Sequence, residues 1–351
     1  MGLEANCMPT AIGSVPFTGL DHATRAIFKN FPEIPFWPQM PNTSFRENMY
    51  VQFTENLPGA VVDADAGRVY FDTTNNIAER MEELYAAYIA GDLEYFALEE
   101  GSARGFFGFL DVLDTGASPE IKLLKGHVTG PISLGLAVTD EQRRPCLYND
   151  QLREAILKSL AMNIKWQEAR MRGVRPDAET LIFVDEPYLV SYGSAYISLS
   201  REDALGFLDE VVSAAEGLVG VHCCGNTDWT LLMETQIDVV SFDAYDYAQS
   251  MALYPEVVKE FLERGGILAW GVIPSGLPSP DQITKESIDS LVQRLEDAME
   301  LLVEKGIDKG QLVRQGLITP SCGTAAMTPE NAERAFAFCR GVSDRMQEKY
   351  L

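Results

Sequence analysis

Short apolar runs rich in Val, Ile and Phe alternate along this chain with longer amphipathic segments. Runs of this length indicate buried strands, and apolar residues that recur every three to four positions indicate helices. The pattern predicts eight strands, at residues 9–14, 33–38, 121–128, 180–185, 218–223, 238–243, 266–272 and 316–321. The clearest helices are expected between them, at 151–172, 199–216, 283–305 and 329–349.

Eight alternations of strand and helix are typical of an α/β protein of the (β/α)8 type, a TIM barrel. An open doubly wound sheet is the alternative, and the count of eight favours the closed barrel. Residues 41–118 are too long for a simple crossover, so we expect a helical insertion after strand two, made mostly of 75–97 and 103–113. No low-complexity linker interrupts the chain, and residues 1–351 are expected to form a single domain.

The charge balance excludes some partners. The chain has 28 basic and 52 acidic residues, a net charge of −24, which repels phosphate backbones and anionic membranes. We therefore expect no nucleic-acid and no membrane partner. No apolar run approaches the roughly 20 residues that a membrane helix needs. The N-terminus lacks the basic patch and apolar stretch of a secretory signal, so a cytoplasmic location is expected.

Polar and cysteine residues gather where the predicted strands end. In a barrel the carboxyl ends of all strands form one face, and active sites are built there. Six such features lie at or just past a strand end: Ser14, residues 129–131, residues 185–187, the pair His222 and Cys224, Asp243, and residues 322–323. The six cysteines form no compact disulfide pattern, so clustered cysteines favour metal binding or catalysis.

The stretch GVHCCGNTDW, residues 220–229, contains the first candidate metal ligands. Side chains alternate along a strand, so His222 and Cys224 share one side and can present a nitrogen and a sulfur to one zinc ion. Cys322 is a third candidate, and Asp243 a fourth, with Asp246 competing for that position. Such a donor set favours zinc. For the first pair alone, ordinary packing in a buried strand is the alternative.

These motifs, in this order, resemble segments of the catalytic barrel of cobalamin-independent methionine synthase. The wider superfamily includes zinc-dependent methylcorrinoid:thiol methyltransferases and uroporphyrinogen decarboxylases. The resemblance runs through essentially the whole chain but is carried by short motifs: TAIGSVP at 10–16, VTGP at 128–131, FVDEP at 183–187, HCC at 222–224, DVVSFD at 238–243 and PSCG at 320–323.

The resemblance implies roles for individual residues. It gives four zinc ligands: His222, Cys224, Asp243 and Cys322. It also implies that Ile12 and Ser14 contact an amino-acid substrate, and that Asp185 binds the ammonium group of that substrate. His127, next to the VTGP turn, is a second catalytic candidate beside Asp185, and a structural histidine is the alternative there.

Three departures from the synthase pattern matter. The synthase has a glutamate ligand where this chain has Asp243, and a substrate-binding glutamate where Thr43 stands, so Thr43 is the substrate-binding candidate at that position. The synthase also has a catalytic histidine after strand seven, whereas no histidine follows His222 here. The sequence also shows no counterpart of the folate-binding N-terminal half of the full-length synthase. The missing histidine and this missing half disfavour a folate methyl donor.

The expected activity is therefore a zinc-dependent methyl transfer to a small thiol such as homocysteine or coenzyme M. A methylcorrinoid is the expected donor, carried by a separate corrinoid protein. One rival is a metal-free, uroporphyrinogen decarboxylase-like lyase. It is disfavoured because the segment 35–49 offers Arg46 alone and has Gln39 in an arginine position. The other rival is a non-catalytic barrel that binds zinc or a corrinoid.

Overall fold

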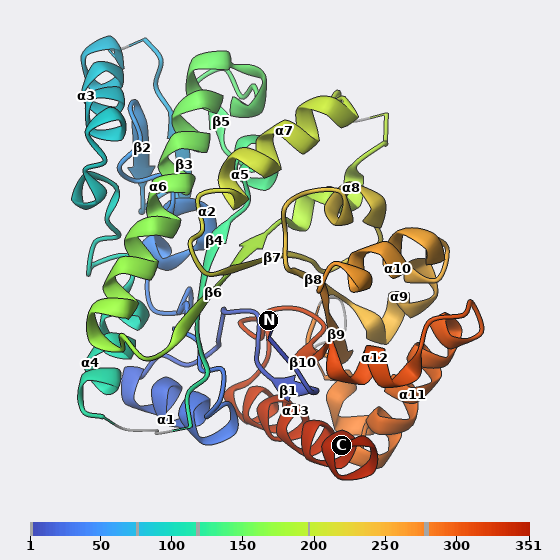
Figure 1. Ribbon diagram of the computed structural model, residues 1–351. Helices are drawn as coiled ribbons and strands as arrows, with labels where there is room; N and C mark the ends of the chain where they lie inside the picture. Colours follow the sequence, from blue (N-terminus) through green and yellow to red (C-terminus); the bar gives the residue numbers. More distant parts are fainter. Residues whose placement is uncertain (1–2, 75–76, 117–119, 196, 277–280) are drawn as a thin grey trace.

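A curled parallel sheet of seven strands forms the centre of the protein, in a computed structural model that describes residues 3–74, 77–116, 120–195, 197–276 and 281–351 (Figure 1). The order of strands across the sheet is β1-β10-β9-β8-β7-β6-β4. Their bounds are Met8–Pro9 (β1), Leu123–Thr129 (β4), Glu179–Asp185 (β6), Leu218–Cys223 (β7), Val239–Phe242 (β8), Ile267–Ile273 (β9) and Gly316–Pro320 (β10). The order never reverses direction, which excludes the doubly wound alternative.

The second predicted strand, 33–38, is not a regular strand, and that prediction is wrong. The segment still hydrogen bonds with Lys125 of β4 on one side, and the next residue, Gln39, hydrogen bonds with Gly13 and Val15 beyond β1 on the other. It therefore spans the gap between the two edges of the sheet through isolated bridges. A continuous ladder does not form because proline has no N–H to donate, and the segment contains Pro35 and Pro38.

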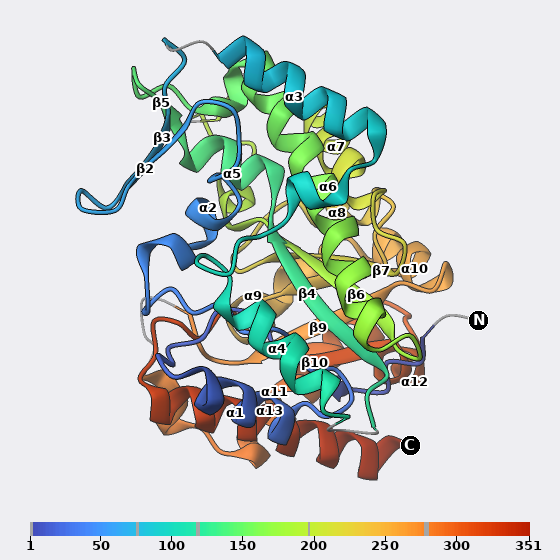
Figure 2. The same cartoon turned by 90° about the vertical axis from the view of Figure 1, so that its left-hand side faces the viewer.

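Helices surround the sheet (Figures 1 and 2). The four clearest predicted helices are confirmed as α6 (Asp150–Val174), α7 (Arg201–Val212), α11 (Ile288–Val303) and α13 (Pro329–Tyr350). The shorter helices around the sheet are α1 (Leu20–Asn30), α5 (Pro131–Ala137), α8 (Trp229–Met233), α9 (Ala244–Met251), α10 (Pro255–Glu263) and α12 (Lys309–Arg314). Short 3-10 turns occur at Phe45–Glu47, Leu93–Phe96, Cys146–Tyr148, Pro187–Ser191 and Gln282–Lys285.

Residues 41–118 contain the expected helices and one feature that was not predicted. The helices are α3 (Ile77–Ala90) and α4 (Arg104–Asp114), together with the short α2 (Met49–Gln52). Residues 75–76 and 117–118 of the predicted segments lie outside the described residues. The unpredicted feature is a hairpin of β2 (Ala60–Asp63) and β3 (Arg68–Phe71), extended by β5 (Thr139–Asp140).

The hairpin has a sequence signal, since two short apolar runs flank a turn that contains Gly67 at positive φ. It lies with α3 at one end of the molecule, opposite α1 and α13 (Figures 1 and 2). That residues 41–118 are an insertion within one domain stays a prediction.

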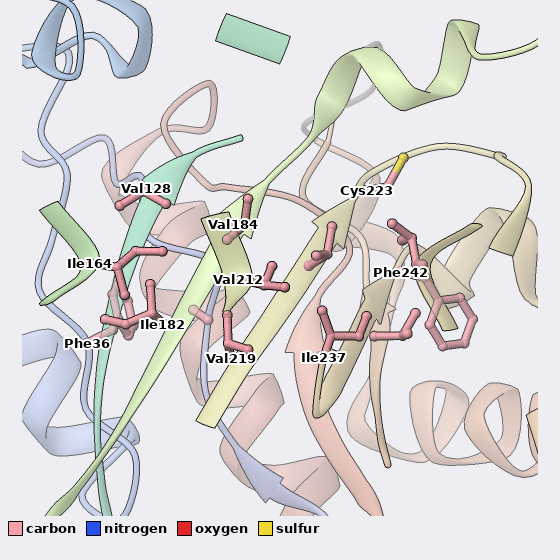
Figure 3. Packing of buried hydrophobic residues seen from close by; sticks show 14 of the residues in the cluster. Phe36, Val128, Ile164, Ile182, Val184, Val212, Val219, Cys223, Ile237 and Phe242 are labelled. Atoms are coloured by element: carbon pink, nitrogen blue, oxygen red, sulfur yellow. The ribbon is translucent and has the colours of Figure 1, made fainter. Parts of the chain in front are cut away.

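Side chains alternate between the two faces of the curled sheet. Val128, Val184 and Val219 point outward, toward the surrounding helices (Figure 3). Leu181 and Phe183, the neighbours of Val184 in sequence, belong to a separate apolar cluster inside the curl. Because the period of a strand is two, this alternation also directs the side chains at positions 185 and 222 inward. Over the residues that the structure describes, no helix is both long and apolar enough to cross a membrane.

The contact between α4 and segment 33–39 predicts a stability effect. A Cβ on Gly105 of α4 would overlap the carbonyl oxygen of Pro38, so the two backbones touch. We expect Gly105→Ala to lower the free energy of unfolding by about 1–3 kcal/mol through overpacking. Gly206→Ala in α7 is the matched control, because no atom lies within 4 Å of its added Cβ. The control should gain about 0.5–1 kcal/mol in urea denaturation. Equal stability of Gly105→Ala and wild type would contradict this packing.

Candidate metal centre

His222, Cys224 and Cys322 come together at the carboxyl ends of the strands. Their nitrogen and sulfur ligand atoms all lie within 4.8 Å of one another. His222 is the last residue but one of strand β7, and Cys224 follows that strand directly. Cys322 lies two residues beyond β10. Zinc–ligand bonds of about 2.0–2.3 Å require this kind of spacing between ligand atoms. The three residues could therefore hold a zinc ion.

The imidazole of His222 is oriented by Ser241 of the neighbouring strand β8. Nδ1 of His222 lies 2.9 Å from the Ser241 hydroxyl, whereas Nε2 is buried without a hydrogen-bond partner in the described residues. A proton on Nδ1 is donated to Ser241, which leaves the lone pair on Nε2. A buried, unpartnered nitrogen is costly unless a ligand occupies it, so this atom fits a metal ligand. Sequence reasoning missed Ser241, although it stands within DVVSFD.

The loop that carries Cys322 is fixed by two neighbours. The Ser275 hydroxyl donates to the carbonyl of Cys322 at 2.8 Å and accepts from its N–H at 3.0 Å. A Cβ on Gly323 would overlap the Ser14 hydroxyl oxygen, so glycine is required for this close approach. The hydroxyl of Ser14 thus adjoins the loop that follows β10. Ser275 was also missed, and it lies in the segment GVIPSG that lacks a histidine.

The two candidate ligand cysteines influence each other's ionisation. The interaction with the Cys322 thiol lowers the pKa of Cys224 to about 4, and the same interaction raises the pKa of Cys322. Cys224 is therefore the first of the two to become a thiolate, the form that binds metals. Burial raises the pKa of Cys223 to about 12. Cys223 points away from the site, into the outer packing layer (Figure 3).

Asp243 lies nearby but is not part of the group of three. It caps helix α9, where its Oδ1 accepts from the N–H groups of Tyr245 at 2.9 Å and Asp246 at 3.0 Å. Burial raises the pKa of Asp243 to about 7. Asp246 is exposed on α9. Which of the two serves as a fourth ligand stays a prediction.

Two of the sequence motifs form one structural unit. The carboxylate of Glu186 accepts from the N–H groups of Ile132 at 2.9 Å and Ser133 at 2.8 Å, at the start of α5. A Cβ on Gly130 would overlap this carboxylate, so VTGP and FVDEP pack directly on each other. The unit fixes the backbone beside Asp185. The Oδ1 atom of Asp185 is buried with no partner in the described part of the chain, and burial raises the pKa of this carboxyl to about 6.

Lys125 lies among these groups and was also missed. It is fully buried, its Nζ donates to the carbonyl of Ile12 at 2.5 Å, and the ammonium lies 4.1 Å from the centre of the Phe183 ring. Burial lowers the pKa of Lys125 to about 7, and the charge of Asp185 opposes this shift. The signal in the sequence is a lysine in the middle of the apolar strand LLKGHV, since lysine is rarely fully buried.

The other two site candidates from the sequence, His127 and Thr43, contact side chains and backbone groups of the protein itself. The His127 ring stacks on Trp37 at 3.7 Å, and burial lowers its pKa well below the usual range, which keeps the ring neutral. Both of its nitrogens are buried and lack partners within the described ranges. The Thr43 hydroxyl lies 2.6 Å from the Met40 carbonyl and 2.9 Å from a carboxylate oxygen of Glu47. The catalytic role of His127 and the substrate contact of Thr43 stay predictions.

The buried amine of Lys125 predicts a pH dependence of stability. Its pKa is about 7 in the folded protein and about 10.4 in an unfolded chain. Between these values the unfolded chain binds more protons, so the contribution of Lys125 to the free energy of unfolding rises with pH. From about pH 7 to about pH 8.5, the stability of wild type relative to Lys125→Met should increase by about 1.6 kcal/mol.

Urea denaturation of the metal-free, reduced protein at the two pH values measures this increase. Lys158→Met is the matched control, because hydrogen bonding to Glu210 raises the pKa of Lys158 and removes any titration in this window. A constant difference between wild type and Lys125→Met would show that the buried amine does not titrate there.

Comparison with solved structures shows the fold. A putative vitamin-B12-independent methionine synthase from Listeria monocytogenes is 16% identical, with a TM-score of 0.53 over 95% of this chain and 86% of that one. A B12-independent methionine synthase from Shewanella sp. W3-18-1 gives 14% identity and a TM-score of 0.47, over 69% of this chain and 67% of that one. No protein-family model matches the sequence, and no curated protein matches it. The expected resemblance to B12-independent methionine synthase barrels is therefore shown at the level of the fold.

Proposed function

We propose that this protein is a zinc-dependent methyltransferase that moves a methyl group from a methylcorrinoid to a small thiol. The observation that carries the proposal is the group of buried His222 and half-buried Cys224 and Cys322, whose ligand atoms lie within 4.8 Å of one another. The unpartnered Nε2 of His222 and the low pKa of Cys224 both suit metal ligation. This donor set, two sulfurs and one nitrogen, is one that zinc prefers.

The ligands decide what kind of chemistry is favoured. Zinc at this position would lower the pKa of a bound thiol, so that the thiol is a thiolate at neutral pH. Two cysteinates neutralise the charge of the ion, and a carboxylate from Asp243 would make the centre negative. Such a centre withdraws less electron density from a bound sulfur than one with neutral ligands. A thiolate there stays a good nucleophile, which favours alkylation of sulfur over hydrolysis.

The transfer from a methylcorrinoid requires no proton at the leaving group. The thiolate sulfur forms a bond to the methyl carbon, and the carbon–cobalt bond breaks with both electrons left on cobalt. A transfer that needs no proton donor agrees with a chain in which no histidine follows His222. A separate corrinoid protein that docks at the carboxyl ends of the strands would deliver the donor.

The residues beside the metal group suit a thiol that is also an amino acid, such as homocysteine. The buried Oδ1 of Asp185 has no partner in the described residues and would accept from an ammonium group. The Ser14 hydroxyl adjoins the Cys322 loop through its contact with Gly323 and would bind the other polar end. Ser14 and Asp185 would then bind the two polar ends of the substrate whose sulfur is on the metal.

The rival decarboxylase reading is disfavoured by contacts in the segment after residue 38. Gln39 donates to Gln52 at 2.9 Å, and Arg46 pairs with Glu55. Neither side chain is available for a substrate with many carboxylates.

The second rival is a barrel that binds zinc without catalysis. Its metal coordination would not change when a thiol is added, whereas that of the proposed enzyme would.

The first test is the zinc content of the full chain. We expect about one zinc per chain in wild type and almost none in Cys322→Ala, because three protein ligands are the usual minimum for tight binding. Cys223→Ala is the matched control, since this neighbouring thiol points away from the site and should not affect the metal. Loaded protein should then transfer methyl groups from methylcobalamin to homocysteine or another small thiol.

Two results would contradict the proposal. One is wild-type protein, prepared without chelators, that contains no metal. The other is a Cys322→Ala variant that keeps both zinc and turnover. Folding of each variant is checked by circular dichroism.

A further inference from the structure

A tyrosine that no motif singled out lies at the carboxyl ends of β4 and β6, where Asp185 stands. The short helix α2 places Tyr50 there, because the Thr129 hydroxyl at the end of β4 donates to the carbonyl of Met49 at 2.8 Å. Thr129 pairs with Asp185 in the register of β4 and β6. The residue after Met49 is thereby held above the carboxyl ends of these two strands.

The ring of Tyr50 is fixed by a second contact, with Tyr188. The two rings meet edge to face, with centroids 6.4 Å apart and an interplanar angle of 77°. Tyr188 lies in the 3-10 turn Pro187–Ser191, three residues after Asp185. An edge-to-face pair of this kind orients both rings. Tyr50 is therefore held from two sides, by β4 and by the loop after β6.

The hydroxyl of Tyr50 is a donor without a partner. It forms no hydrogen bond with any residue in the described ranges, and the side chain is half-buried. Burial raises the pKa of Tyr50, and the charges of Tyr188, Glu186, Cys224 and Asp185 raise it further, so the phenol keeps its proton. Thr129 pairs with Asp185, and Tyr188 follows Asp185 by three residues, so both contacts of Tyr50 hold its ring near the strand end that carries this carboxylate.

We infer that Tyr50 is a specificity-determining residue, whose hydroxyl donates a hydrogen bond to the carboxylate of an amino-acid thiol bound at the metal. This inference rests on the proposed function, and it gives the substrate carboxylate a second hydrogen-bond donor beside Ser14. A substrate carboxylate near the acidic groups around Tyr50 needs a hydrogen-bond donor to offset their repulsion, and the protonated phenol is such a donor. Asp185 then binds the ammonium end of the same substrate.

Three cations of the same strands and insertion are engaged with other groups. The ammonium of Lys125 is fully buried and donates to the Ile12 carbonyl at 2.5 Å. Arg104 donates to Glu47 at 2.7 Å, and Arg46 pairs with Glu55. A phenol, which is uncharged and rigid, can contact the substrate carboxylate without the desolvation cost of a buried cation.

The test compares two thiols that differ only in the carboxylate: homocysteine and 3-aminopropane-1-thiol. The full chain is loaded with Co²⁺, and each thiol is titrated while the sulfur-to-cobalt absorption band is recorded. We expect Tyr50→Phe to raise the dissociation constant of homocysteine about tenfold, the usual effect of losing a hydrogen bond to a charged group. The dissociation constant of 3-aminopropane-1-thiol should stay within about twofold.

Tyr188→Phe is the matched control, because it keeps the ring pair and removes the other hydroxyl. It should change neither dissociation constant by more than about twofold. The inference is overturned if Tyr50→Phe leaves homocysteine binding unchanged, or if it weakens both thiols equally. If wild-type protein binds cobalt but no thiol perturbs its spectrum, the proposed function itself fails and the inference fails with it.

Discussion

One row of paired residues across four parallel strands determines the arrangement of the site. In the register of β4, β6, β7 and β8, Thr129 pairs with Asp185, Asp185 with His222, and His222 with Ser241. Neighbouring strands lie about 4.8 Å apart, so these residues are in contact across the curl of the sheet. A shift of one residue in any pair would turn an inward side chain outward. It would separate His222 from Asp185 or from Ser241.

Glycine residues allow the loops to approach this row. Gly130 gives space to the carboxylate of Glu186, Gly323 to the hydroxyl of Ser14, and Gly105 to the backbone of segment 33–39. In each case a single Cβ would overlap an atom from a distant part of the chain. These three contacts tie the loop after β4, the loop after β10 and the segment 33–39 to the same end of the sheet.

The site also concentrates polar groups that weaken the fold. His222 Nε2 and Asp185 Oδ1 are buried without partners among the described residues, and Lys125 has a fully buried amine. Burial of such groups costs free energy, and a sequence selected for stability alone would replace them with apolar residues. The large apolar clusters on both faces of the sheet offset this cost. His222 and Asp185 lie together at the carboxyl ends of their strands, and such a concentration of unpaired polar groups is what a binding site requires.

The sequence by itself determined the alternation of strands and helices, the inward direction of His222 and the polar nature of the strand ends, because these depend on local periodicity. It misjudged segment 33–38, where the apolar pattern indicates a strand but prolines remove the N–H donors that a ladder needs. Only the tertiary structure decided that Cys322 meets Cys224, that Ser241 hydrogen bonds with His222, and that Ser275 hydrogen bonds with Cys322. These contacts join residues far apart in the chain, and they follow from strand register and loop packing, which local periodicity does not specify.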